Sequence, residues 1–390
     1  MIETSRTAFQ KSHLRVAMEQ ANMRGAWLGI DLVGLAANVR ALRSALNPGT
    51  RLMAVVKADA YGHGASMVAE AALQHGASSL GVATVDEGVK LRRSGHQAPI
   101  LVLGIVPDAA YQPAIDAGLQ LTVSSARQIR LVERVARGLG RAAELHLKVN
   151  TGMTRVGCEV HEAIGLAQHV LHSDALRMTG LSSHFASAEA DQPHDAERQL
   201  QSFNALAERL HAAEIGILRH VANSAGAIFL PHAHLDMVRV GLALYGHSPR
   251  PEEPSPVALI PVMSVRARVS QVKDVGQGAR VGYGSTWAAP KATRLALVPV
   301  GYADGLPRSL SNKGAVVVRG QPCPIVGRVS MDQTVIDVGD LPVEPGEEVC
   351  LLGGQGPDAI SIERWASAAG TISYEVLCGL GQRLPRVYYR

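Results

Sequence analysis

Short apolar runs alternate with helical patterns from residue 27 to about residue 250, and this alternation is the feature that most restricts the fold. The apolar runs are WLGIDL, LMAVVK, LGVATV, ILVLG, LQLTV, LHLKVN, MTGLSSHF, LRHVANS and LDMVRVG, with helical segments such as VGLAANVRALRSAL, ARQIRLVERVAR and DAERQLQSFNALAERLHAAE between many of them. Strands that alternate with helices favour βα units and a parallel sheet, so we expect an eight-stranded βα barrel. Nine runs are one too many, so the first or last should pair elsewhere. A doubly wound sheet is the competing fold, although no GxGxxG follows the first strands as a dinucleotide-binding version would require.

The pattern changes near residue 250, where PRPEEPSP interrupts the chain. Beyond it come MSVRARVSQV, TRLALVPV, GAVVVRG, PIVGRVS, TVIDV and EEVCLLG, which are short, β-rich and separated by Gly and Pro turns. Only SIERWASAAG is expected to be helical there. We therefore predict an N-terminal helical extension at 1–26, a βα barrel at 27–265 and a mostly β domain at 266–390.

The composition is typical of a globular enzyme with a sizeable core, because 47% of the 390 residues are hydrophobic and 18% are charged. A net charge of +4 without a basic run gives no reason to expect nucleic acid, and a weakly anionic small molecule fits better. The four cysteines form no CxxC pair and show no metal-ligand spacing, so we expect reduced, mostly buried thiols and no metal. No signal peptide or membrane span is recognisable, and a cytoplasmic protein is expected.

Lys57 follows the run LMAVV and precedes the glycine-rich segment ADAYGHG. This position at a strand end predicts an amine at the mouth of a cavity, where partial desolvation lowers its pKa and lets it condense with an aldehyde. Tyr61 follows closely, and Gly62 and Gly64 allow the backbone to approach a ligand. The alternative is a rim lysine that extends into solvent.

Further polar groups lie at the predicted strand ends, where the catalytic groups of a βα barrel gather. They are Arg155 in KVNTGMTRVG, His184 in SSHFAS, and Asn223 with Ser224 in VANSAGA. The last pair precedes a helix and suits an anion such as phosphate, although a plain helix cap is equally compatible. Arg239, inside MVRVG, requires an acceptor if it is buried, and an ion pair would also satisfy it.

The segment VVKADAYGHG resembles the pyridoxal phosphate attachment signature of alanine racemases, and further motifs, VGYGST and RVSMDQ among them, follow in that family's order from about residue 27 to residue 388. The resemblance implies a barrel with a C-terminal β domain, pyridoxal 5'-phosphate as cofactor and alanine as the small-molecule substrate. It also implies a homodimer with shared active sites, and D-alanine for peptidoglycan as the product. Two departures are Asn150, where an aspartate is common, and Val240, where many members carry proline.

The resemblance also assigns roles to single residues. Lys57 would bind the cofactor covalently and act as one base, and Tyr283 from the partner subunit would act as the second base. Alone, Tyr283 would be interpreted as a packing or interface residue. The residues implied to bind the cofactor are Lys57, Tyr61, His184, Asn223, Ser224, Arg239, Gly241 and Tyr374. Those implied to bind the substrate carboxylate are Arg155 and the backbone N–H at Met331 and Asp332, and those implied to line an access channel are Tyr302, Arg308, Arg328 and Tyr374.

Lys148 aligns with a lysine that is often carbamylated in this family, whereas an unmodified lysine paired with an acid is the alternative. Three other functions stay open: a racemase that also accepts serine or larger amino acids, a related pyridoxal phosphate decarboxylase, and a cofactor carrier without enzymatic activity. The sequence does not distinguish a biosynthetic from a catabolic role.

Overall fold

The structure is a computed structural model that describes residues 19–190, 194–211, 217–354 and 359–389. The chain divides into two compact units. One comprises residues 34–60 and 64–260, and we call it the barrel unit. The other comprises the described residues as far as Val33, the short segment 61–63, and the residues from Pro261 onward, and we call it the β unit.

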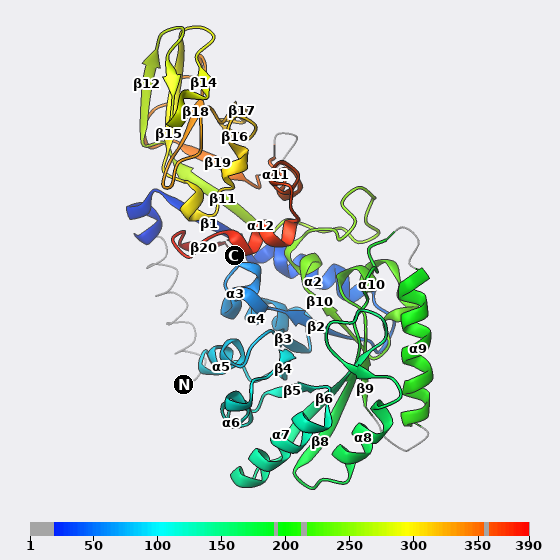
Figure 1. The fold of residues 1–390 in the computed structure, drawn as a ribbon. Coiled ribbons are helices and arrows are strands. Elements are labelled where there is room, and N and C mark those ends of the chain that lie inside the picture. The colour runs from blue at the N-terminus through cyan, green and yellow to red at the C-terminus, as the bar shows by residue number, and fades with distance from the viewer. Residues whose placement is uncertain (1–18, 191–193, 212–216, 355–358, 390) are drawn as a thin grey trace. The chain divides into compact units, whose positions relative to one another are not determined.

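The barrel unit contains a nearly closed parallel barrel (Figure 1), which confirms the predicted fold class. Within the described residues its eight strands run in the order β10, β2, β3, β4, β5, β6, β8, β9. The gap between β9 and β10 is bridged by backbone hydrogen bonds from Asp236 N to Arg219 O (3.2 Å) and from Arg239 N to Ala222 O (3.0 Å). The strand bounds are β2 Arg51–Val55, β3 Ser79–Val82, β4 Ile100–Ile105, β5 Gln120–Val123, β6 Ala143–Asn150, β8 Leu176–Ser182, β9 Leu218–His220 and β10 Met237–Val240, and the short β7 (Cys158–Glu159) pairs with β6 outside the barrel.

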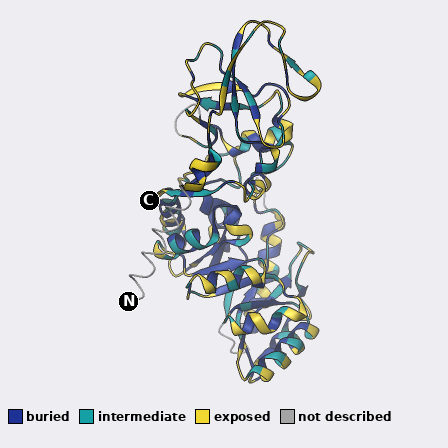
Figure 2. Cartoon of the chain, turned by 90° about the vertical axis from the view of Figure 1, so that its left-hand side faces the viewer, coloured by how far each residue is buried: buried dark blue, intermediate teal, exposed yellow. Residues whose placement is uncertain are grey.

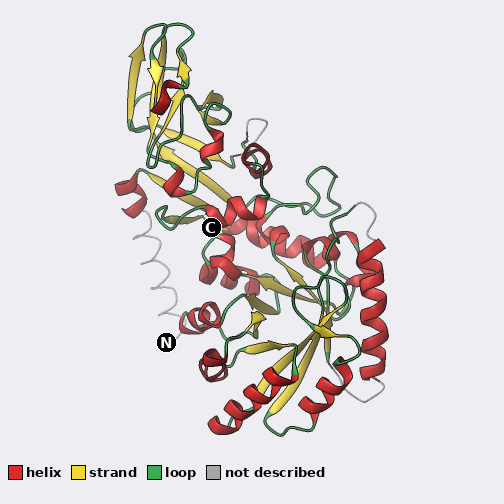
Figure 3. Ribbon diagram, viewed as in Figure 1, coloured by secondary structure: helices red, strands yellow, loops and turns green. Residues whose placement is uncertain are grey.

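Helices, drawn red in Figure 3, follow most of these strands and surround the barrel, whose strands are drawn yellow. They are α2 Leu32–Ala45, α4 Ala65–Gln74, α5 Val85–Arg93, α6 Tyr111–Asp116, α7 Ala126–Leu139, α8 Ala163–Leu171, α9 His194–His211 and α10 Ser224–Phe229, and the segment labelled α3, Lys57–Tyr61, is a turn with positive φ. Their ends follow local chemistry. Thr84 and Glu87 form a reciprocal capping box at the start of α5, and Gly140, at φ +61°, ends α7 in the left-handed conformation that glycine adopts without strain.

The core of the barrel unit combines the strand residues, which Figure 2 shows as mostly buried, with the inward-facing residues of the helices, such as Val39, Val132 and Phe203. All four residues of β10 and four of the five of β2 are buried. Strands covered on both faces require nearly continuous apolar sequence, which is what LMAVV supplies. Arg239 of β10 is the exception, because it is a cation that is only 5% exposed.

The β unit holds the first apolar run, as the count of nine runs suggested. Strand β1 (Ala26–Asp31) pairs antiparallel with β11 and parallel with β20, and not with the barrel strands. The six-stranded sheet has the order β17, β16, β19, β11, β1, β20, and β12, β15 and β18 form a second sheet. The bounds are β11 Met263–Arg268, β12 Gln271–Val275, β13 Arg280–Val281, β14 Trp287–Ala288, β15 Thr293–Val298, β16 Ala315–Val318, β17 Gln321–Pro324, β18 Thr334–Asp337, β19 Glu348–Leu352 and β20 Arg386–Tyr389.

Two predictions for the β unit were wrong. PIVGRVS was expected to be a strand, but β17 ends at Pro324 and only Ile325 makes one further isolated bridge. Proline lacks the N–H that a ladder needs, and Gly327, at φ +74°, turns the chain. SIERWASAAG was expected to be the only helix, and it forms α11 (Ile362–Ala369), but α12 (Ser373–Gly379) follows it at once.

The predicted N-terminal extension lies largely outside the described residues, and residues 19–24 of it are helical. All four cysteines are free thiols. Cys158 and Cys323 are buried as expected, whereas Cys350 is partly accessible and Cys378 is exposed. No helix in the described ranges has both the length and the apolar character needed to cross a bilayer.

Candidate active site

A cavity of about 230 Å³ lies in the barrel unit where several strands end. The polar side chains around it come from segments far apart in the sequence: Lys57 after β2, Lys148 and Asn150 on β6, Arg155 after β6, His184 after β8, and Arg239 on β10. Because parallel barrel strands all end on the same face, these groups converge without any proximity in sequence. The structure thus brings together five of the predicted site residues: Lys57, Lys148, Arg155, His184 and Arg239.

Lys57 is half-buried at the start of a strained turn. The four residues after it, Ala58 to Tyr61, all have positive φ, between 51° and 56°. None is glycine, so each costs about 1–2 kcal/mol relative to a right-handed conformation. The turn is held by hydrogen bonds from Ala60 N to Val56 O (2.9 Å) and from Ala65 N to the Asp59 carboxylate (2.8 Å). Strain held this firmly fixes the direction in which Lys57 leaves the strand.

Glu87 anchors the beginning of the same turn. Its Oε1 accepts from Ala58 N at 2.7 Å, and its Oε2 accepts from Ala83 N at 2.7 Å. The carboxylate therefore links the backbone beside Lys57 to the end of β3. We did not predict this role, although the capping-box spacing of Thr84 and Glu87 is visible in the sequence and could have identified it.

Arg239 is held by five hydrogen bonds. Its Nη1 donates to His220 O (2.9 Å) and His220 Nδ1 (2.8 Å). Its Nη2 donates to Ser183 O (2.9 Å), Val221 O (3.0 Å) and His184 Nδ1 (2.8 Å). Burial lowers the pKa of Arg239 to about 10, so it is still a cation at neutral pH. The acceptors that the sequence required are three carbonyls and two imidazoles, not an acid.

The guanidinium fixes the protonation of the histidines around it. A guanidinium can only donate, so His184 Nδ1 and His220 Nδ1 must accept and each neutral ring carries its proton on Nε2. His220 Nε2 lies 2.8 Å from His146 Nδ1, so it donates to that ring. Burial, and then the Arg239 charge, lower the pKa of His184 to about 2 and that of His146 to about 3, and they lower the pKa of His220 in the same way. All three histidines are therefore neutral.

The ring of His146 fits in this chain only because residue 180 is glycine. A Cβ at Gly180 would lie 2.2 Å from His146 Nδ1. Neither His146 nor His220 was predicted as a site residue, because each is a single polar residue inside an apolar strand pattern. Only the structure shows that His220 links Arg239 to His146 through hydrogen bonds.

Lys148 contributes a second amine to the cavity. Its Nζ donates to Ser183 O at 3.3 Å. Burial lowers the pKa of Lys148 well below its ordinary value, and the charges of Arg239 and Arg155 lower it further. Burial and these two cations therefore disfavour the ammonium form of Lys148.

The loop that carries Arg155 is shaped by Asn150. The Asn150 side-chain oxygen accepts from Gly152 N (3.1 Å) and Thr154 N (2.9 Å), and its amide donates to Glu159 (3.0 Å). These bonds hold Thr154 at φ +53° directly before Arg155. An aspartate at position 150 would accept the same backbone bonds but would repel the Glu159 carboxylate. Asn150 is thus compatible with its surroundings, although it departs from the family pattern.

The ends of β9 and β10 are joined by Ser224. Asn223 is the N-cap of α10 and accepts from Gly226 N at 3.0 Å. Ser224 Oγ accepts from Gly241 N (3.1 Å) and Ala243 N (3.3 Å), and no group in the described ranges accepts the proton of this hydroxyl. The loops after the seventh and eighth strands of a barrel, with a short extra helix, form a common phosphate site.

The remaining predicted residues belong to the β unit. The rings of Tyr61 and Tyr374 lie 6.0 Å apart, and burial, followed by the effect of Tyr374, raises the pKa of Tyr61. Tyr283 is 73% exposed in the turn Tyr283–Ser285, and Met331 is 53% exposed. The two glycines on either side of Tyr283 lie close to Arg328. A Cβ at Gly284 would be 3.2 Å from the Arg328 guanidinium. The turn that carries Tyr283 thus packs against Arg328.

Sequence models of the alanine racemase N-terminal and C-terminal domains match residues 30–249 and 262–388. An alanine racemase of Symbiobacterium thermophilum is 43% identical over 373 residues, which cover 95% of this chain and 99% of that protein. The crystal structure of alanine racemase from Streptomyces lavendulae superposes with a TM-score of 0.89 at 40% identity, covering 94% of this chain and 97% of the other. A histidine racemase from Leuconostoc mesenteroides gives a TM-score of 0.87 at 29% identity, covering 94% and 98%. With both domains matched in order over nearly its whole length, the chain belongs to the alanine racemase family of amino-acid isomerases.

Proposed function

We propose that this racemase uses pyridoxal 5'-phosphate, bound covalently by Lys57, to interconvert L-alanine and D-alanine. The observation that carries the proposal is the cavity that places Lys57 and the buried cation Arg239 together. Bound pyridoxal phosphate supplies an electron-accepting ring that acidifies the α-proton of an attached amino acid. The proposed boundaries are 27–265 for the cofactor-binding barrel and 266–390 for the C-terminal domain.

The Nε N–H of the Arg239 guanidinium is suited to donate a hydrogen bond to a pyridine nitrogen. Five hydrogen bonds use Nη1 and Nη2, and no described group accepts from Nε. This last N–H belongs to a side chain that lines the cavity. A guanidinium donates a proton without giving it up, so a ring nitrogen bonded to it would stay unprotonated. The ring would then be a weaker electron sink, which favours return of the proton to the α-carbon over transamination.

The phosphate would be held by the Ser224 hydroxyl with Gly241, Tyr61 and Tyr374, and Asn223 would shape that site as the helix cap. Two observations support this: no group in the described ranges accepts the Ser224 hydroxyl proton, and Asn223 and Ser224 follow the seventh barrel strand.

Inversion at the α-carbon requires a base on each face of the substrate, because one base tends to return the proton to the face that it left. We assign Lys57 to one face and Tyr283 of the partner subunit to the other. The high exposure of Tyr283 suits a residue that functions in another protomer. His184 would assist the tyrosine: it is neutral, and its Nε2 proton is polarised by Arg239 through Nδ1.

Arg155 and the backbone N–H at Met331 would hold the substrate carboxylate. We also propose that Lys148 is carbamylated, because its lowered pKa favours the free amine, which can add to carbon dioxide with loss of one proton to solvent. The resulting carbamate anion would pair with Arg155, which lines the same cavity. After incubation with ¹³C-bicarbonate, a carbamate carbon signal that is present in the wild type and absent from Lys148→Ala would support the modification. Its absence from both proteins would exclude it.

Two alternatives differ in chemistry. The histidine racemase neighbour indicates that this fold also serves other side chains, so a broader racemase is tested by rates across several amino acids, serine included. A decarboxylase would release carbon dioxide, and a cofactor carrier would bind pyridoxal phosphate without changing any amino acid. We further propose a cytoplasmic homodimer that supplies D-alanine for peptidoglycan.

The test of the two bases replaces Lys57 and Tyr283 separately and follows α-proton exchange from each enantiomer in deuterium oxide. We expect Tyr283→Phe to slow α-proton exchange from one enantiomer much more than from the other. Exchange at wild-type rates from both enantiomers in Tyr283→Phe would disprove the assignment.

A further inference from the structure

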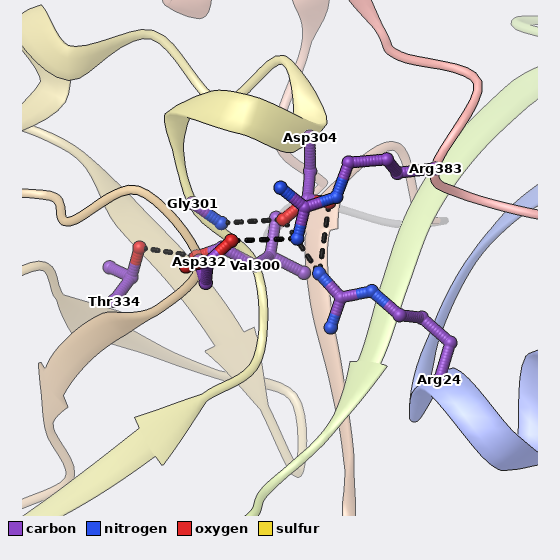
Figure 4. Close-up of polar contacts among 7 residues, drawn as sticks. All are labelled: Arg24, Val300, Gly301, Asp304, Asp332, Thr334 and Arg383. Atoms are coloured by element: carbon purple, nitrogen blue, oxygen red, sulfur yellow. Dashed lines mark hydrogen bonds and ion pairs between the residues drawn. The ribbon is translucent and has the colours of Figure 1, made fainter.

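Asp304 is a buried carboxylate in the β unit, outside the cavity described above. It ends the turn Tyr302–Asp304 and is 0% exposed. Gly301 N donates to its Oδ2 at 3.0 Å, and Arg24 Nη2 lies 2.9 Å from both of its oxygens (Figure 4). A charge that is removed from water in this way requires close partners, and among the described residues Arg24 is the nearest cation to it.

A second arginine connects Asp304 to another acid. Arg383 Nε lies 3.3 Å from Asp304 Oδ1, and its Nη2 donates to Asp332 Oδ1 at the shorter distance of 2.7 Å. Hydrogen bonding to Asp332, and then the charge of Asp304, raise the pKa of Arg383. The network therefore contains two cations and two anions, and Arg383 is shared between the anions.

The same network holds the loop that carries Met331. Tyr302 N donates to Ser330 O (3.0 Å), and Ala303 N donates to Met331 O (2.9 Å). The fit is close, because a Cβ at Gly301 would lie 2.3 Å from Ser330 O. The backbone at Met331 is thus fixed on one side by the turn that ends at Asp304 and on the other by the bond from Asp332 to Arg383.

We propose that Arg24, from the helical residues that precede β1, is a positioning residue for substrate binding, because it neutralises Asp304 and so leaves Arg383 available to hold Asp332 beside Met331. The proposal rests on the proposed function in one respect: it takes the Met331 backbone N–H as a donor to the substrate carboxylate. It also gives the segment before residue 27 a role that its sequence did not reveal.

The effect of removing Arg24 follows from the burial of the two acids. Because Asp304 has no exposed surface, water cannot hydrate its carboxylate once the Arg24 cation is removed. Asp332 is 54% exposed and is readily hydrated. Arg383 therefore moves toward Asp304, and Asp332 and the loop at Met331 lose their anchor.

The test compares Arg24→Gln, Arg24→Lys, Asp332→Asn and the double variant Arg24→Gln/Asp332→Asn in the holoenzyme. We expect Arg24→Gln to raise the KM for alanine about tenfold, a loss comparable with one charge-assisted hydrogen bond, with kcat changed much less. Arg24→Lys keeps the charge and should restore part of the affinity. The control is Arg266→Gln, which breaks the Arg266–Glu348 pair in the same unit and should leave KM unchanged.

The double variant decides between positioning and general destabilisation. If both substitutions act by releasing Asp332, the double variant has the same KM as the more severe single variant. A KM that equals the product of the two separate effects would overturn the proposal, as would an Arg24→Gln KM no higher than that of Arg266→Gln.

Amide hydrogen exchange of residues 328–334 gives a readout that does not depend on catalysis. Exchange there should be faster in Arg24→Gln than in the wild type and unchanged in Arg266→Gln. Equal exchange in all three proteins would overturn the proposal. A wild-type protein that fails to racemise alanine would count against the proposed function, while this exchange measurement would still test the network.

Discussion

Replacing Arg239 with glutamine tests whether the buried guanidinium organises the barrel face of the site. Three of its acceptors, Val221 O, His184 Nδ1 and His220 Nδ1, have no other donor among the described residues. A glutamine amide offers two N–H groups on a shorter side chain and cannot reach both histidines. With two acceptors left unsatisfied at about 1–3 kcal/mol each, we expect a local loss of about 3 kcal/mol.

The measurement is native-state amide hydrogen exchange of β8, β9 and β10 in the cofactor-free protein, because a chain with two compact units need not unfold in one step. Arg219→Gln is the matched control. It is the same substitution on the neighbouring strand, but Arg219 pairs with Asp236 at a half-exposed position, where about 0.2–1 kcal/mol is expected. An Arg239→Gln protein that loses no more protection than Arg219→Gln would refute the reasoning.

Three further predictions follow from the same geometry. Ala58 is exposed at φ +53°, so Ala58→Gly should stabilise the turn after Lys57 by about 0.5–1 kcal/mol and Ala58→Val should destabilise it, as measured by amide exchange at residues 57–61. Ser224→Ala removes a hydroxyl donor from the proposed phosphate site, so it should weaken binding of pyridoxal phosphate about tenfold or more and leave pyridoxal binding unchanged, as measured by titration. The pKa of His146 falls from 6.5 in the unfolded chain to about 3 in the fold, so below pH 6.5 the unfolded chain binds the extra proton and stability falls with the pH. Between pH 6.5 and pH 5 the wild type should lose about 1.7 kcal/mol more local stability than His146→Gln, and equal losses in native-state amide exchange of β6 at the two pH values would contradict this.

The strand pattern predicted the barrel because parallel strands buried on both faces need apolar sequence, and the runs from LMAVVK to LDMVRVG supply it. The pairing of β1 with β11 and β20 could only be suspected from the count of runs, because pairing between distant segments leaves no local signal. The strand predicted at PIVGRVS failed because the proline and Gly327 outweighed its apolar residues.

The position of a polar side chain was predictable where it stands at or near a strand end, as with Lys57 and Arg239, which both line the cavity. It was not predictable where several distant groups act on one another. The chain from Arg239 through His220 to His146 joins β10, β9 and β6, and no spacing in the sequence connects them. The positive φ values after Lys57 were equally hidden, because alanine and aspartate give no sign of a left-handed turn.

The central claim is that Lys57 carries the cofactor through its amine. Treating the purified protein with borohydride and sequencing its peptides by mass spectrometry tests this claim directly. We predict that a visible absorption band is bleached and that a reduced pyridoxyl phosphate group is found on the peptide that contains Lys57. A colourless protein with Lys57 unmodified after incubation with pyridoxal phosphate would contradict the account.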